Sequence, residues 1–107
     1  MNLRDIVLTR CGGYCEHCGK PLPNNFALHH RKLRSQGGAN TPDNLIAVHH
    51  ECHNLATKSI HMNPRASLLT GHMVSGYANP EETPLRLPDG RQVLLTPNGG
   101  YDQGDNT

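Results

Sequence analysis

Two short pairs of metal-binding residues constrain this chain more than any other feature of its sequence. Cys15 and Cys18 are separated by two residues, and His49 and Cys52 are separated in the same way. Such pairs are typical of a tetrahedral zinc site, in which each pair binds the ion from one tight turn. The chain has no Trp and a single Phe, and only 35% of its residues are hydrophobic, so the apolar core is small. We therefore expect a structural zinc ion to contribute to folding.

The ligand set has alternatives. Cys11 lies four residues before Cys15 and is a competing fourth ligand in place of His49. It is otherwise expected to be a small buried residue at a helix end. Cys15 and Cys18 can also be read as a redox or unliganded pair, and His53 can take the place of Cys52.

The expected cellular compartment favours metal binding over disulfide formation by the cysteines. The first ten residues carry Arg4, Asp5 and Arg10 and lack the apolar segment of a secretory signal. No stretch reaches membrane-spanning length. We expect a cytoplasmic, reducing setting, which is host cytoplasm if a phage encodes the chain, and no membrane partner. Clustered cysteines bind metal there.

The pattern of hydrophobic and turn-forming residues predicts an α+β fold. A first helix spans about residues 2–10 and stops at Gly12-Gly13, and strands at 26–30 and 45–48 flank a polar loop. A helix follows over 51–60, with Leu55 packing inward, and another begins at Asn63-Pro64, an N-cap and first-turn pair. The turn Pro88-Asp89-Gly90 predicts a hairpin between 85 and 95.

These elements divide the chain into three parts. Residues 1–62 are expected to form the metal-stapled core, and residues 63–97 a helix and hairpin packed on it. Residues 98–107 are polar and rich in Gly, so we expect a disordered tail.

Four residues of the core segment are suited to hydrolysing a phosphodiester: His29, His30, Asn44 and His53. The reaction needs a base to deprotonate water, a cation to stabilise the added negative charge, and a group that holds the base in one tautomer. On a strand, His29 and His30 point to opposite sides. At most one of them then faces a flat site, unless the strand is distorted or a ligand draws the other in. An ion bound by His29 and His53 together sets that geometry and leaves His30 free to act on water. Each of these residues also has an ordinary reading, as a surface histidine or, for Asn44, a turn residue.

The same segment resembles the HNH endonucleases, also called ββα-metal or His-Me finger nucleases. The matching text is Leu28-His29-His30, then Asn44 to Val48, then Cys52-His53-Asn54, with the family's intervals between them. The loop from Gly37 to Asp43 also looks like the family's loop. The fold implied is a ββα-metal core, here stapled by zinc and extended by flanking helices and a C-terminal hairpin.

The resemblance implies a role for each residue. His30 is the general base, His29 and His53 bind the catalytic divalent ion, and Asn44 pins the loop and the orientation of His30. Many relatives have Asp at the position of His29, and Cys at that of His49. A nitrogen-rich ion site tolerates zinc, nickel or manganese more readily than an Asp-bearing site that suits magnesium.

DNA contacts are expected from basic residues near these motifs. Residues 1–65 hold eight lysines and arginines against four acidic residues, and residues 66–107 hold two against five. Such contacts neutralise phosphates without reading sequence, so low sequence specificity is expected. The expected nucleic-acid-binding residues are Arg31, Lys32, Arg34, Lys58 and Arg65. The remaining histidines are read as surface residues (His17, His50, His72), with His61 able to approach phosphate or metal.

Two classes of function follow. The first is a metal-dependent DNA endonuclease. The second is a non-catalytic zinc-knuckle module that binds DNA or protein, which has no reason to keep His30, Asn44 and His53 together. In its compact, free-standing form the chain resembles HNH proteins that phages encode beside their DNA-packaging machinery. The resemblance therefore also implies a partner such as terminase or another packaging protein.

Overall fold

The structure is a computed structural model that describes residues 2–102. The predicted α+β class is confirmed. Two antiparallel sheets, β1-β2 and β3-β4-β5, are combined with short helices. The elements are α1 (Leu3–Cys11), β1 (Ala27–His30), η1 (Arg34–Gln36), β2 (Leu45–Val48), η2 (Glu51–Leu55), α2 (Pro64–Thr70), η3 (Pro80–Glu82), β3 (Leu85–Arg86), β4 (Gln92–Leu95) and β5 (Tyr101–Asp102). No helix within residues 2–102 has the length and apolar character needed to cross a membrane.

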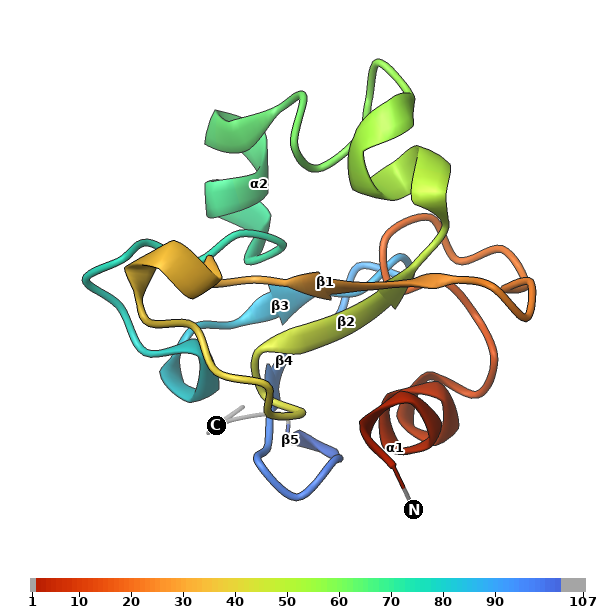
Figure 1. The fold of residues 1–107 in the computed structure, drawn as a ribbon, viewed down its shortest axis with the longest axis horizontal. Coiled ribbons are helices and arrows are strands. Elements are labelled where there is room, and N and C mark those ends of the chain that lie inside the picture. The colour runs from red at the N-terminus through yellow and green to blue at the C-terminus, as the bar shows by residue number, and fades with distance from the viewer. Residues whose placement is uncertain (1, 103–107) are drawn as a thin grey trace.

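The β1-β2 ribbon lies at the centre of the molecule, with α1 on one side of it and α2 and η2 on the other (Figure 1). Its register pairs His29 with Ile46 and His30 with Leu45. All four residues of β2 are buried, so the predicted buried strand is confirmed. Ile46 and Val48 pack into one hydrophobic cluster, and Leu45 and Ala47 pack with Val7 of α1 in the other. Both faces of the ribbon are therefore covered.

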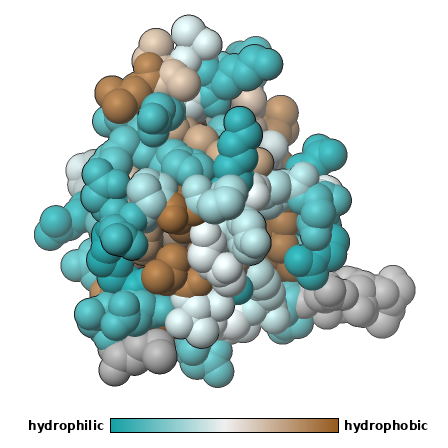
Figure 2. Space-filling model, turned by 90° about the vertical axis from the view of Figure 1, so that its right-hand side faces the viewer, coloured by the Kyte–Doolittle hydropathy of each residue, from teal (hydrophilic) through white to brown (hydrophobic). Residues whose placement is uncertain are grey.

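The predicted C-terminal hairpin is also present, with Leu85 paired to Val93 across the turn. Leu85 and Leu95 are fully buried and share the larger cluster with Ile46 and Val48. Side chains on both sides of residue 62 therefore build one core. Outside it, the face in Figure 2 is largely hydrophilic, with smaller hydrophobic areas between polar side chains.

The expected disorder of residues 98–107 is wrong for the part that the structure describes. Tyr101 and Asp102 form β5 and pair with β4. The Tyr101 hydroxyl donates to the buried Glu16 carboxylate at 2.5 Å, which ties the segment down. Residues 103–107 lie outside the described residues.

The predicted helix over 51–60 is wrong in length and orientation. Only Glu51–Leu55 is helical, in a wide turn, and Leu55 is 71% exposed. The chain then folds back beside η2, because Ile60 N donates to Cys52 O at 2.7 Å and Ile60 is fully buried. Ile60 occupies the core position expected of Leu55. Asn63 precedes α2 as predicted, but its amide donates to the carbonyls of Thr57 and Ser59 and does not cap the helix.

Arg31 corrects the expected set of DNA contacts, because its side chain is fully buried. Its guanidinium donates to four backbone carbonyls, those of Gly71, Asp43, Pro80 and Thr83, at 2.7–3.1 Å. Burial lowers its pKa to about 10. The group holds the C-terminal segment against β1 and is not available to phosphate.

We expect Arg31→Ala to lower the free energy of unfolding by more than about 3 kcal/mol. The reason is that each buried carbonyl left without a donor costs about 1–3 kcal/mol. Urea unfolding at a fixed zinc concentration measures this. Arg34→Ala is the matched control, because Arg34 is an exposed neighbour and should change stability by less than about 0.5 kcal/mol. Equal stability of Arg31→Ala and the wild type would contradict the structural role.

Candidate active site and metal centres

The four residues of the two spaced pairs lie together. The Sγ atoms of Cys15, Cys18 and Cys52 and a ring nitrogen of His49 are all within 4.8 Å of one another. The distance between the Cys15 and Cys52 sulfurs is 3.9 Å. Zinc–sulfur bonds of about 2.3 Å in a tetrahedron place two sulfurs about 3.8 Å apart, so this group fits a zinc knuckle.

Local hydrogen bonds favour the metal-binding forms of Cys15 and His49. The backbone N–H groups of His17 and Cys18 point to Cys15 Sγ at 3.4 Å, which stabilises a thiolate. His49 Nε2 donates to Pro21 O at 2.8 Å, so Nδ1, which is 3.4 Å from Cys18 Sγ, keeps its lone pair. Cys11 is not part of the group, and its thiol donates to Leu8 O inside α1. The geometry favours His49 over Cys11.

A second group contains His29, His53 and His61, whose ring nitrogens also lie within 4.8 Å of one another. His53 Nε2 and His61 Nε2 are 3.1 Å apart. The fold-back after η2 brings His61 there, because His61 N donates to His53 O. The sequence left His61 ambiguous, because the helix expected over 51–60 gave no reason for the chain to fold back between His53 and His61.

His29 is held as a neutral imidazole. Its Nε2 donates to His72 O at 2.8 Å, so the Nδ1 lone pair is free. Burial, together with the neighbouring His53 and His61, lowers the pKa of His29 to about 3. Burial and His61 also lower the pKa of His53. Since metal ligation requires neutral imidazole, these shifts suit a cation site.

His72 itself was expected at the surface, and that expectation is wrong. It is 7% exposed, and its ring lies between the Thr70 hydroxyl and Glu16 O. The preceding Gly71 has a φ of 83°, and a Cβ there would lie 1.9 Å from Pro84 O. This close approach turns the chain inward after α2. Burial lowers the pKa of His72 to about 4.

The other two histidines without an assigned role differ from each other. His50 is exposed, as expected. His17 is half-buried and its ring contacts that of His72 edge to face.

His30 follows His29 in β1 and is not a member of the three-histidine group, which consists of His29, His53 and His61. Its Nε2 is 2.6 Å from the Oδ1 atom of Asn40. An amide oxygen only accepts, so Nε2 carries the hydrogen and Nδ1 has the lone pair. Sequence reasoning missed Asn40, because nothing in a polar loop distinguishes one Asn from its neighbours.

Asn44 is buried and braces the loop that carries Asn40. Its Oδ1 accepts from Lys32 N at 2.7 Å, and its Nδ2 donates to Lys32 O and Ala39 O at 3.0 Å. The expected contact with the loop is therefore present. Contact with His30 itself comes from Asn40.

The remaining expected DNA-binding residues lie on or near the surface. Arg34, Lys58 and Arg65 are exposed. Lys32 is half-buried and donates to Ala78 O at 3.1 Å. Their role as phosphate contacts stays a prediction.

A short antiparallel ribbon is thus followed by a turn of helix, and two groups of side chains could each hold a metal ion: the three-histidine group of His29, His53 and His61, and the Cys3His group of Cys15, Cys18, His49 and Cys52. Residues 15–59 match the family model described as HNH endonuclease. This confirms the resemblance in the sequence. No curated protein and no solved structure matches the chain.

Proposed function

We propose that this protein is a metal-dependent endonuclease that hydrolyses phosphodiester bonds in DNA. One observation carries the proposal: His30, with its Nδ1 lone pair fixed by Asn40, directly follows His29 of the three-histidine group within an HNH domain. A binding module needs the Cys3His group but neither of these features.

The three-histidine group is suited to the catalytic cation. His29, His53 and His61 each offer one nitrogen. The backbone oxygen of His72 accepts a hydrogen bond from His29 Nε2 and so fixes the orientation of that ring. A divalent cation bound there supplies positive charge that offsets the charge developing on the phosphate. An all-nitrogen donor set favours zinc, nickel or manganese over magnesium. The Cys3His group is assigned to structural zinc.

The chain's own groups then perform the proton transfer. His30 Nδ1 accepts a proton from the attacking water, and the bond to Asn40 keeps the ring in the tautomer that can do so. Asn44 holds the backbone on both sides of that loop, so it acts as a positioning residue.

The substrate is DNA with little sequence preference. Arg34, Lys58 and Arg65 are exposed cations that can reach phosphates, and Lys32 keeps two N–H groups beyond its bond to Ala78 O. Phosphate contacts of this kind do not read bases. A place in phage DNA packaging with a terminase-like partner rests on the sequence resemblance alone.

Incubation of the purified protein with supercoiled plasmid tests the function. We expect conversion to open-circular or linear DNA with added manganese, nickel or zinc, and none without added cation, because phosphodiester hydrolysis here needs the cation's charge. Gel electrophoresis measures the products. An intact plasmid with every divalent cation, from protein that retains its structural zinc, would support the non-catalytic binding module instead.

A further inference from the structure

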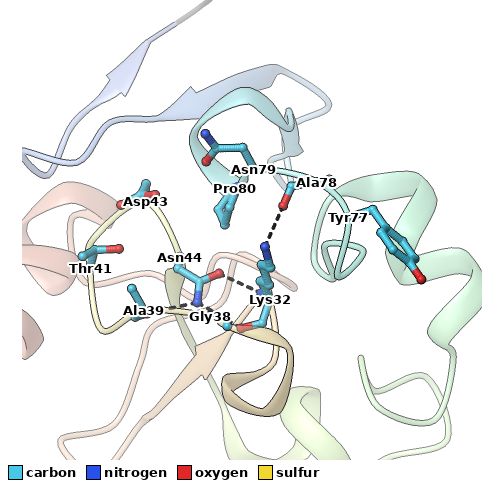
Figure 3. Close-up of a pocket in the computed structure, with 11 residues that line it drawn as sticks. Lys32, Gly38, Ala39, Thr41, Asp43, Asn44, Tyr77, Ala78, Asn79 and Pro80 are labelled. Carbon is cyan, nitrogen blue, oxygen red and sulfur yellow. Dashed lines mark hydrogen bonds between the residues drawn. The ribbon is translucent and has the colours of Figure 1, made fainter.

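A cavity of about 450 Å³ opens between the loop of residues 37–44 and the segment of residues 77–80. In Figure 3, Tyr77 stands at one end, Thr41 and Asp43 lie at the other, and Lys32 reaches between them toward Ala78. Sites for small molecules and cofactors commonly have volumes of about 300–1,000 Å³. The cavity is therefore large enough for one nucleotide.

Its position links it to the candidate base. Ala39 and Thr41 both line the cavity, and Asn40 between them contacts His30 at 2.6 Å. Asn44, which also lines the cavity, braces this loop through Lys32 and Ala39. A DNA strand whose phosphate lies at His30 thus has the cavity beside it, on the same loop.

The chemistry of the lining suits a nucleotide. The Tyr77 side chain is 103% exposed, so its ring packs on nothing and both faces are free. The Lys32 ammonium donates once, to Ala78 O, and has two further N–H groups for a phosphate. At the end opposite Tyr77, the Asp43 carboxylate repels phosphate. A phosphate is consequently favoured at Lys32 and a base against Tyr77.

We propose that this cavity binds an unpaired nucleotide of the DNA strand being cut, with its base stacked on Tyr77 and its phosphate at Lys32. The nucleotide must lie outside a continuous double helix, unpaired and unstacked, because a base within a duplex has both faces covered by the neighbouring bases. This inference rests on the proposed endonuclease function and specifies its substrate as DNA with a single-stranded or flipped-out nucleotide beside the cleaved bond.

Fluorescence anisotropy with a labelled single-stranded oligonucleotide, in buffer without added divalent cation, tests the stacking. Tyr77→Ala should weaken binding by about five- to 150-fold, which corresponds to one base stacked on an aromatic ring. Tyr77→Phe should bind as the wild type does, since it keeps the ring. Tyr14→Ala is the matched control, because Tyr14 is a 54% exposed tyrosine that does not line this cavity.

Two further arms separate the parts of the proposal. Lys32→Gln should reduce the dependence of log affinity on log salt by about 0.7, the slope of one single-strand phosphate contact, whereas Tyr77→Ala should leave that slope unchanged. Wild-type protein should bind the single strand more tightly than a duplex of equal length. Equal affinities of Tyr77→Ala and the wild type for the single strand, or tighter binding of the duplex, would overturn the proposal.

Failure of this inference and failure of the proposed function give different results. If the wild type cuts plasmid but Tyr77→Ala binds the single strand normally, the cavity is not the subsite and the endonuclease stands. If the wild type neither binds nor cuts DNA, the endonuclease itself is refuted.

Discussion

Replacing His30 with alanine is expected to lower the rate of plasmid cleavage by about 10²- to 10⁴-fold, the usual contribution of a general base. The ring's Nδ1 lone pair is the proposed proton acceptor, and Asn40 holds it in place from the other side. His30 is only half-buried and lies at the end of β1, so its removal should leave the fold and the structural zinc intact. Single-turnover cleavage measures the defect, and circular dichroism and zinc content check the fold.

The cation ligands provide the contrast. His53→Ala and His61→Ala should also cut slowly, but for a different reason, which is weaker binding of the cation at the three-histidine group. Raising the manganese or nickel concentration should partly restore these two variants and should not restore His30→Ala. His50→Ala is the matched control, because His50 is exposed, lies outside the three-histidine group and bonds to Asn25 O. Cleavage by His30→Ala at the wild-type rate would refute the assignment of the base.

Loss of the structural zinc is expected to unfold the protein. Structural zinc in small domains contributes about 10–16 kcal/mol of apparent binding free energy, whereas whole domains are stable by only about 5–15 kcal/mol. Cys18→Ser is the sharpest variant, because the Cys18 side chain is exposed and contributes little to the apolar core. We expect it to lose zinc and its cooperative thermal transition. Metal analysis and thermal unfolding measure both effects.

Cys11→Ser is the control for that experiment. Cys11 is the partly buried last residue of α1 and lies outside the Cys3His group, so this variant should keep its zinc and lose only a modest amount of stability. Zinc-free Cys18→Ser protein with a wild-type melting temperature would contradict a folding role for the metal. Loss of zinc from Cys11→Ser would instead make Cys11 the fourth ligand.

Features set by neighbours along the chain could be predicted from the sequence. The apolar run Leu45–Val48 is a buried strand, Gly12 ends α1 in the left-handed conformation, and the turn at Pro88-Asp89-Gly90 joins β3 to β4. Within each zinc-site pair, the two intervening residues place both side chains on a single tight turn. These properties depend on contacts within a few residues, which periodicity and turn chemistry describe.

Features set by partners far along the chain were decided only by the tertiary structure. Arg31 follows His30 and was expected to face DNA, yet it is buried because four carbonyls, three of them at least forty residues away, converge on its guanidinium. His61 joins His29 and His53 only because the chain folds back after η2. The sequence around a charged side chain or an imidazole looks the same whether that side chain lies in water or among carbonyls and other imidazoles. Its environment is determined by packing between distant segments, and so is its role.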